Sequence, residues 1–282
     1  MQRLLEKERY KISSQKGLVS EERLLKQLCD LGIVPNSTLL VHSSLSSIGW
    51  VVNGEQSVLQ SLIRALGSNG TLMMPAYTAI NQHPSGWLHP KLPVEWLLSD
   101  VADSLLGFDP KTSAVQYVGR LPEYFRTYPE VSRSRHPLYS FCARGKNKHY
   151  LLEQHSYDFG LGESSPLGKI YEVDGYVLLL GVSFNNNSCW HLAEFFSDIK
   201  EKKVYTTSAK IMCHGQAYWQ TLKELNFISD GFSSVQESFL LSKPSSYQSG
   251  YVGSAYCHLF KVREFVDFAV KHIKNHHSVI DI

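Results

Sequence analysis

A histidine and a glutamate three residues apart are the first residues in this sequence that could do chemistry together. His191 and Glu194 stand in the segment 190–196, whose composition predicts the start of a helix, and residues three apart on a helix share one face. Imidazole titrates near neutral pH, so His191 could act as a general base that Glu194 orients. The alternative is that His191 packs at the start of the helix while Glu194 is solvated.

A run of hydroxyl side chains follows the segment 38–42, which predicts a strand. Ser43, Ser44, Leu45 and Ser46 come directly after His42. Where a parallel strand leads into a loop before a helix, backbone N–H groups and hydroxyls can hold a phosphate or a polar acyl carrier. An ordinary serine-rich turn is the alternative.

A basic stretch could serve the same ligand. Arg133 and Arg135 flank Ser134, and His136 follows them before Pro137. Guanidinium groups bind phosphate through paired hydrogen bonds, which suits a phosphorylated carrier. The stretch is otherwise a basic surface loop with a structural histidine.

Several other kinds of site are not indicated. The sequence contains no glycine-rich dinucleotide motif, no phosphate-binding loop with its lysine and no nucleophile elbow around a serine. Cys189 lies two residues before His191, and such positions do not face each other on a helix, so we expect Cys189 to pack rather than to attack a substrate. The five cysteines are scattered without a Cys-x-x-Cys pair, so we expect neither a metal site nor a disulfide framework.

These residues need a scaffold, and the apolar pattern predicts an α/β fold. A strand over 38–42, a helix over 54–66 and a strand over 71–74 form a strand–helix–strand unit, which favours a parallel sheet. The unbroken apolar run 177–182 predicts a third strand, buried on both faces, that leads to His191. Open α/β folds place their chemistry at the carboxyl ends of such strands. Further elements expected are antiparallel strands over 203–213 and 216–222, a strand over 251–259 and a closing helix over 262–274.

We therefore expect a mostly parallel central sheet with flanking helices and an added antiparallel C-terminal portion. Residues 1–19 are interpreted as an N-terminal arm and residues 20–282 as a single domain. The segment 79–113 contains four prolines together with Trp87 and Trp96. A long irregular segment in a compact protein is more often a functional cover than a plain connection.

Charge and composition limit the partners. The chain has a net charge of +2 and no run of lysine or arginine, so we expect no nucleic-acid partner. No apolar run is long enough to cross a bilayer, and the first residues lack the apolar core of a signal peptide. Together with reduced cysteines these features favour the cytoplasm and no membrane partner. The oligomeric state stays open, with a homodimer as one alternative.

Several short motifs, taken as a set, resemble the aminoglycoside 3-N-acetyltransferase family, also called the antibiotic N-acetyltransferases. They occur in the family's order and span residues 20–272, which makes the set specific although each piece alone is weak. The matching stretches are 40–45, 48–49, 70–78, 108–110, 119–126, 133–137, 140–141, 165–169, 178–182, 191–194 and 253–255.

The resemblance implies a CoA-dependent N-acyltransferase with an α/β fold of the family's own type. It implies that His191 lies beside the acceptor amine, with acyl-CoA as co-substrate and no metal. The residues expected to contact acyl-CoA are His42, Ser43, Ser44, Leu45, Ser46, Met74, Thr78, Arg133, Ser134 and His136. Those expected to bind the acceptor are Tyr77, Trp87, Asn186 and Trp190.

The acceptor is expected to be an amino sugar, and the departures from the family favour a nucleotide-linked one of a surface polysaccharide. Resistance enzymes often carry Asp and Thr where this chain has Asn185 to Ser188, and an acidic residue where it has Gln220 and Thr221. A mildly basic chain with fewer carboxylates suits an anionic acceptor better than a polycation. The alternatives are an aminoglycoside acceptor and, in another class, a protein that binds acyl-CoA without catalysis.

Direct transfer in a ternary complex is the expected mechanism. His191 takes the proton of the acceptor amine, and either Glu194 or Asp158 orients its ring. Backbone N–H groups of the turn 43–47, or the Thr78 hydroxyl, hold the oxyanion.

Overall fold

The computed structural model of the protein describes residues 12–13, 17–87, 92–93, 96, 98–197, 203–226 and 232–277. Most of the expected arm, residues 1–11 and 14–16, lies outside this part of the chain, as do residues 88–91, 94–95 and 97 of the segment 79–113. The division into an arm and a single domain therefore stays a prediction.

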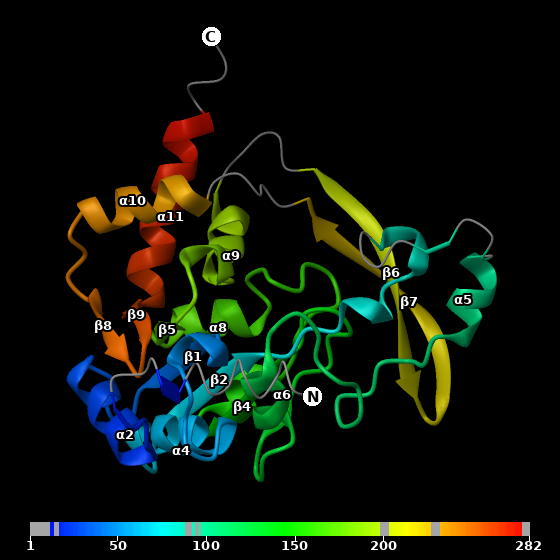
Figure 1. Cartoon of the computed structure of the whole chain (residues 1–282). Coiled ribbons are helices and arrows are strands. Elements are labelled where there is room, and N and C mark those ends of the chain that lie inside the picture. Colours follow the sequence, from blue (N-terminus) through cyan, green and yellow to red (C-terminus); the bar gives the residue numbers. More distant parts are fainter. Residues whose placement is uncertain are drawn as a thin grey trace.

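A seven-stranded sheet lies at the centre of the molecule (Figure 1), in the order β3-β4-β2-β1-β5-β9-β8. The three middle strands, β2, β1 and β5, run parallel, and the pairs on either side of them are antiparallel. The strands are β1 (Thr38–Ser43), β2 (Thr71–Pro75), β3 (Ser132–Arg133), β4 (Phe141–Gly145), β5 (Tyr176–Leu180), β8 (Gln248–Val252) and β9 (Ala255–Lys261). The predicted fold class, an α/β sheet with a parallel centre and an antiparallel C-terminal portion, is confirmed.

One predicted strand is in fact two. The segment 251–259 holds the end of β8 and most of β9, which form a hairpin closed between Val252 and Ala255. Gly253 makes the turn with a φ of +61°, and a Cβ at this position would lie 2.5 Å from the Ile48 carbonyl oxygen. A side chain there would be both strained and obstructed, which is why glycine occupies the turn.

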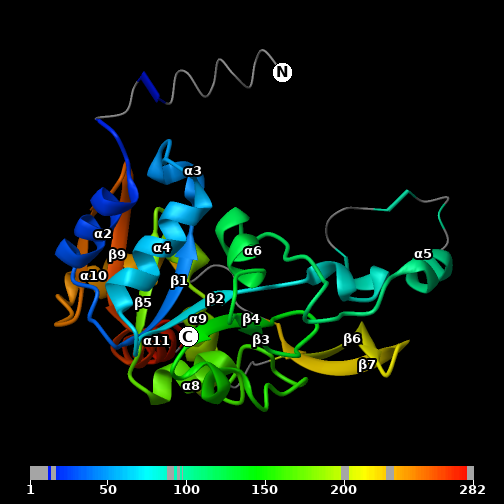
Figure 2. The ribbon, with the colours of Figure 1, turned by 90° about the horizontal axis from the view of Figure 1, so that it is seen from below.

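Helices cover both faces of the sheet (Figures 1 and 2), with α2, α4 and α6 on one face and α8, α9 and α11 on the other. The helices are α2 (Glu21–Asp30), α3 (Leu45–Ile48), α4 (Glu55–Leu66), α5 (Leu98–Ser104), α6 (Arg120–Arg126), α7 (Lys148–Leu152), α8 (Pro166–Glu172), α9 (Cys189–Phe196), α10 (Phe232–Leu241) and α11 (Val262–His277). Three short 3₁₀ turns are η1 (Ala79–Asn81), η2 (Pro84–Gly86) and η3 (Phe184–Asn186). None of the helices in the described part of the chain has the length and apolar character needed to cross a membrane.

Alternation along β1 sends its side chains into two separate cores. Leu39 and Val41 pack against α2 and α4, whereas Leu40 packs on the side of α9 and α11. Because successive residues of a strand face opposite sides of the sheet, His42 falls on the same side as Leu40. This side carries α9.

The strands β6 (Val204–Cys213) and β7 (Gln216–Leu225) form an antiparallel ribbon, as predicted, and the ribbon shares no strand with the main sheet. Figures 1 and 2 both show it beside α5, at the end of the molecule opposite α2. Single bridges join it to the segment 79–113, at Gln82 with Ala209 and at Phe108 with Ile211. Gln82 and Phe108 of the expected cover thus contact the ribbon, and its role as a cover stays a prediction.

Candidate active site

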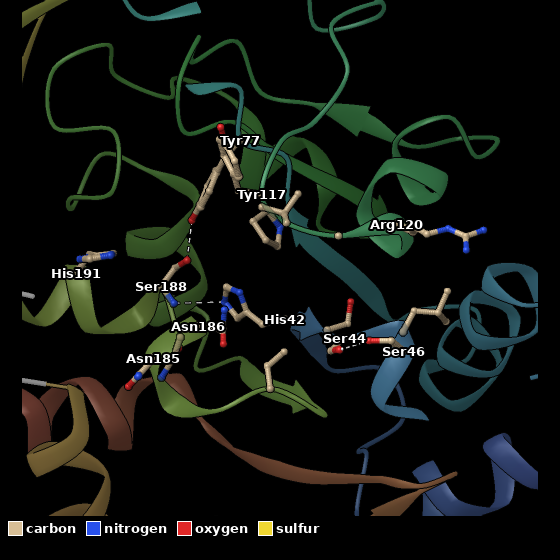
Figure 3. Close-up of a pocket in the computed structure, with 17 residues that line it drawn as sticks. His42, Ser44, Ser46, Tyr77, Tyr117, Arg120, Asn185, Asn186, Ser188 and His191 are labelled. Carbon is tan, nitrogen blue, oxygen red and sulfur yellow. Dashed lines mark hydrogen bonds between the residues drawn. The ribbon is translucent and has the colours of Figure 1, made fainter. Parts of the chain in front are cut away.

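The three parallel strands end at one cavity of about 540 Å³ (Figure 3). Ser43 ends β1, Pro75 ends β2 and Val182 follows β5, and all three line this cavity. Its lining is completed by His42, Ser44, Leu45, Ser46, Tyr77, Tyr117, Val118, Gly119, Arg120, Asn185, Asn186, Asn187, Ser188 and His191. The cavity therefore lies where parallel α/β sheets place their ligands.

The start of α9 is fixed at this cavity by polar contacts. The Asn187 Oδ1 atom accepts a hydrogen bond from the Cys189 N–H at 3.1 Å, which satisfies one of the open donors of the first helical turn. The hydroxyls of Ser188 and Tyr77 lie 2.6 Å apart. The Ser188 N–H donates to Nε2 of His42 at 3.4 Å. These contacts tie the helix to the ends of β1 and β2.

The pair predicted from spacing is formed. His191 Nδ1 lies 2.8 Å from Glu194 Oε2, and the glutamate side chain is 4% exposed while that of the histidine is 23% exposed. A carboxylate can only accept, so the ring proton is on Nδ1 and Nε2 is the basic nitrogen. The arrangement is that of a general base with a buried orienting carboxylate.

Glu194, and not Asp158, is the carboxylate that pairs with His191. Asp158 Oδ1 instead accepts a hydrogen bond from the backbone N–H of Lys223 in β7, at 2.8 Å. The expectation that Asp158 could orient the ring is wrong because this side chain is used to hold the ribbon.

The serine cluster lines the cavity together with His42, Tyr77 and Asn186, as expected of ligand-binding residues. The Ser44 and Ser46 hydroxyls lie 3.1 Å apart, and Ser47 donates to Ser44 Oγ at 2.8 Å. Among the described side chains, two buried polar atoms of this lining have no hydrogen-bond partner, namely Ser43 Oγ and Asn187 Nδ2. Buried polar groups are rarely left in that state without a ligand or water to meet them. Binding of acyl-CoA by these residues stays a prediction.

Burial alters the acid–base chemistry of two lining residues. Burial and the nearby His191 lower the pKa of His42 to about 3, so His42 is neutral at physiological pH. Burial likewise raises the pKa of Tyr77 well above its usual value. Tyr77 therefore keeps its phenolic proton and remains a hydrogen-bond donor.

Four expected ligand-binding side chains do not line this cavity. Met74 and Trp190 are buried in the two cores, because strand and helix alternation turns them away from the opening. The Thr78 hydroxyl donates to the Pro137 carbonyl oxygen at 2.5 Å, and the Trp87 indole donates to the Gln82 carbonyl oxygen at 2.9 Å. The Thr78 hydroxyl and the Trp87 indole N–H are thus used within the protein, and a ligand-binding role for the four side chains stays a prediction.

Three residues of the basic stretch make structural contacts, whereas Arg135 is exposed. Arg133 donates to the carbonyl oxygens of Ala76 and Ser113 and to the Ser140 hydroxyl. Ser134 Oγ accepts from the Phe141 N–H, and His136 Nδ1 accepts from the N–H groups of Leu138 and Tyr139. Arg133 and Ser134 line a separate cavity of about 420 Å³, whereas His136 is fully buried. The geometry therefore supports the alternative that His136 is a structural histidine.

The sequence did not single out the rim formed by Tyr117, Val118, Gly119 and Arg120. Gly119 has a φ of +91° and approaches β1, since a Cβ here would lie 3.6 Å from the Ser43 carbonyl oxygen. The signal was present in the motif 119–126, which begins at this glycine. Asn187 and Ser188 also line the cavity, and they are not among the site residues expected from the sequence.

Among the described residues, no group of three or more histidine, cysteine, aspartate or glutamate side chains is arranged to hold a metal ion.

Comparison with known proteins places these features in one family. A family model described as aminoglycoside 3-N-acetyltransferase matches residues 40–274. The SPbeta prophage-derived aminoglycoside N(3')-acetyltransferase-like protein YokD of Bacillus subtilis (strain 168) is 41% identical over 92% of this chain and 94% of that protein. Aminoglycoside N(3)-acetyltransferase IX of Micromonospora chalcea is 31% identical, with coverage of 92% and 94%.

Two solved structures of such proteins have folds similar to that of this chain. The crystal structure of YokD has a TM-score of 0.89 and 40% identity, with 94% of this chain and 97% of that chain covered. The binary complex of AAC-IIIb with CoASH has a TM-score of 0.82 and 26% identity, with coverage of 92% and 98%.

The expectation of a nucleotide-linked acceptor is wrong, because the relatives are named for aminoglycosides. It rested on the net charge of the whole chain and on acidic residues missing from two short segments. Whole-chain charge describes solubility and long-range attraction, and it does not report the field at one acceptor site.

Proposed function

Because the chain belongs to the aminoglycoside 3-N-acetyltransferase family, we propose that it transfers an acetyl group from acetyl-CoA to the 3-amino group of an aminoglycoside. The observation that carries this proposal is the His191–Glu194 pair at the mouth of the cavity where the parallel strands end. The names of the relatives indicate an aminoglycoside acceptor, and the CoASH complex of AAC-IIIb indicates a CoA donor.

The cavity suits an anionic donor. None of the 17 described residues that line it is acidic, and the Ser44 and Ser46 hydroxyls offer hydrogen bonds, while the guanidinium of Arg120 is paired with Glu55 at 2.6 Å. Phosphate groups are bound by such hydroxyls and by guanidinium groups. A volume of about 540 Å³ is in the range of small-molecule sites.

The chemistry assigned to the chain is removal of one proton. The amine of an aminoglycoside is protonated at neutral pH and reacts as the free amine, after one proton has passed to water. As its nitrogen bonds to the thioester carbon, His191 accepts a second proton from that nitrogen at Nε2, and Glu194 stabilises the resulting imidazolium through Nδ1–H. The C–S bond of acetyl-CoA then breaks, and its electron pair leaves on the CoA sulfur.

A CoA-release assay with matched acceptors tests the proposal. Each aminoglycoside is offered in two forms, with a free 3-amino group and with that amine already acetylated. We expect CoA release and a product heavier by one acetyl group only with the free amine. Equal CoA release with both forms would contradict transfer to the 3-amino group, and binding of acetyl-CoA without release would leave a protein that only binds the donor.

A further inference from the structure

Three of the oxyanion donors expected from the sequence are already used. The Thr78 hydroxyl donates to Pro137. In the turn 43–47, the Ser44 N–H donates to the Leu180 carbonyl oxygen and the Ser47 N–H donates to that of Ser44. Acyl transfer places negative charge on the thioester oxygen, and a donor aimed at this oxygen is the largest single contribution in many such enzymes. Besides the remaining N–H groups of this turn, a side chain that lines the cavity can supply such a donor.

His42 has such a donor. Its Nε2 accepts the Ser188 N–H, so the ring is in the tautomer that carries its proton on Nδ1. Within the described part of the chain, no hydrogen-bond partner is found for this Nδ1–H, although the ring lines the cavity and is 5% exposed. The N–H is left for a molecule in the cavity.

The position of the ring suits the reacting end of the donor. Figure 3 shows His42 between the start of α9, which carries Ser188 and His191, and the hydroxyls of Ser44 and Ser46. A donor molecule whose polar portion lies along the serines and whose acyl group reaches His191 passes His42 on the way. Both His42 and His191 line this one cavity.

Building on the acyl transfer proposed above, we propose that His42 is a catalytic residue whose Nδ1–H donates a hydrogen bond to the thioester carbonyl oxygen. As the amine nitrogen bonds to the carbonyl carbon, the π pair moves to the oxygen and meets this N–H, while His191 takes the amine proton. When the oxyanion collapses, the C–S bond breaks and its electron pair leaves on sulfur. His42 gains and loses no proton in these steps.

A neutral imidazole fits this task. With its pKa lowered to about 3, the His42 ring keeps one donor and one acceptor over the whole physiological range. It therefore does not compete with His191 for the amine proton, and its donor is already fixed by Ser188 before the charge develops. Removing one such donor costs about 10²–10³-fold in turnover.

The first test compares two variants that keep different halves of the ring. In His42→Asn the amide nitrogen reaches the place of Nδ1, whereas in His42→Gln the amide reaches the place of Nε2 and keeps the contact with the Ser188 N–H. We expect His42→Gln to lose roughly 10²–10³-fold in kcat, and His42→Asn to lose no more than about tenfold. The opposite order would show that the contact with Ser188 is what matters, and would overturn the proposal.

The affinity for CoASH is the control for folding and donor binding. CoASH has no acyl carbonyl, so both variants should bind it within about threefold of the unaltered protein. A loss of CoASH binding that parallels the loss of kcat would assign His42 to the scaffold instead.

The second test needs no acceptor and separates this proposal from the proposed function. Infrared difference spectra of the protein with acetyl-CoA, ¹³C-labelled at the carbonyl, report the strength of its hydrogen bond. We expect the band to lie at lower frequency in the unaltered protein and in His42→Asn than in His42→Gln. A band unmoved by His42→Gln would overturn the role of His42 alone, whereas failure of the unaltered protein to bind acetyl-CoA would overturn both proposals.

Discussion

Two histidine–glutamate pairs in the described part of the chain have different surroundings, one within α9 and one between the loop before β4 and the strand β7. In the first, His191 Nδ1 and Glu194 Oε2 are 2.8 Å apart and the histidine side chain is 23% exposed. In the second, His136 Nε2 and Glu224 Oε1 are 3.6 Å apart and both side chains are fully buried.

Every polar atom of the His136 ring is used by the scaffold. Nδ1 accepts two backbone N–H groups, Nε2 lies 3.1 Å from the Tyr157 carbonyl oxygen, and the ring stacks on His155 with centroids 4.8 Å apart. Glu224 accepts the N–H of Gly160 and so joins the ribbon to the core. A histidine can act as a base where one ring nitrogen is held by a partner and the other faces a cavity. A glutamate partner alone therefore does not make a histidine catalytic.

Loss of the pair in α9 should have the largest effect. His191→Ala should lower kcat by roughly 10²–10⁴-fold, because the acceptor amine then has no positioned base. The melting temperature should stay close to that of the unaltered protein. Steady-state kinetics with acetyl-CoA and an aminoglycoside measure this, and an unchanged kcat would remove His191 from the chemistry.

A matched pair of substitutions separates the two glutamates. Glu194→Gln should cut kcat by about 10²-fold, because a neutral amide stabilises the imidazolium poorly. Glu224→Gln, which keeps the oxygen that meets Gly160, should leave kcat within about threefold. Equal effects on kcat would mean that the two pairs are not functionally distinct.

Buried histidines should also make the protein sensitive to acid. Burial lowers the pKa of His42 to about 3 and holds that of His155 well below its usual value. Both stay neutral in the folded state, whereas below about pH 6.5 the unfolded chain binds protons at these residues. Stability should therefore fall between pH 7 and pH 5, by about 2 kcal/mol for each histidine.

Urea unfolding at several pH values measures this effect. His155→Gln should flatten the dependence on pH, and substitution of the exposed His149 by Gln should leave it unchanged. A dependence on pH that survives in His155→Gln without change would assign the acid sensitivity to other groups.

The smallest effect is expected at Cys189. The thiol is fully buried and burial raises its pKa far above the usual value, so no thiolate forms there. Cys189→Ala should keep most of the activity, with a modest loss of stability from the removed sulfur. Mass spectrometry of the protein during turnover should show no covalent acyl adduct, and detection of one would overturn direct transfer.

The sequence predicted what local spacing and strand order control. His191 and Glu194 are three residues apart on one helix, so their contact needed no knowledge of the fold. The serine cluster followed from its place after a parallel strand. The sequence could not show that Thr78 and Arg133 are used by distant carbonyl groups, or that Glu224 reaches Gly160, because such contacts exist only after the ribbon has packed onto the core.

The ribbon of β6 and β7 has a consequence for how such a protein can diverge. It pairs with no strand of the seven-stranded sheet, so a change in its length or sequence leaves the register of β1, β2 and β5 intact. Its partner, the segment 79–113, is equally remote from that register. Insertions and exchanges can thus accumulate on this side of the molecule while the carboxyl ends of the parallel strands are inherited unchanged.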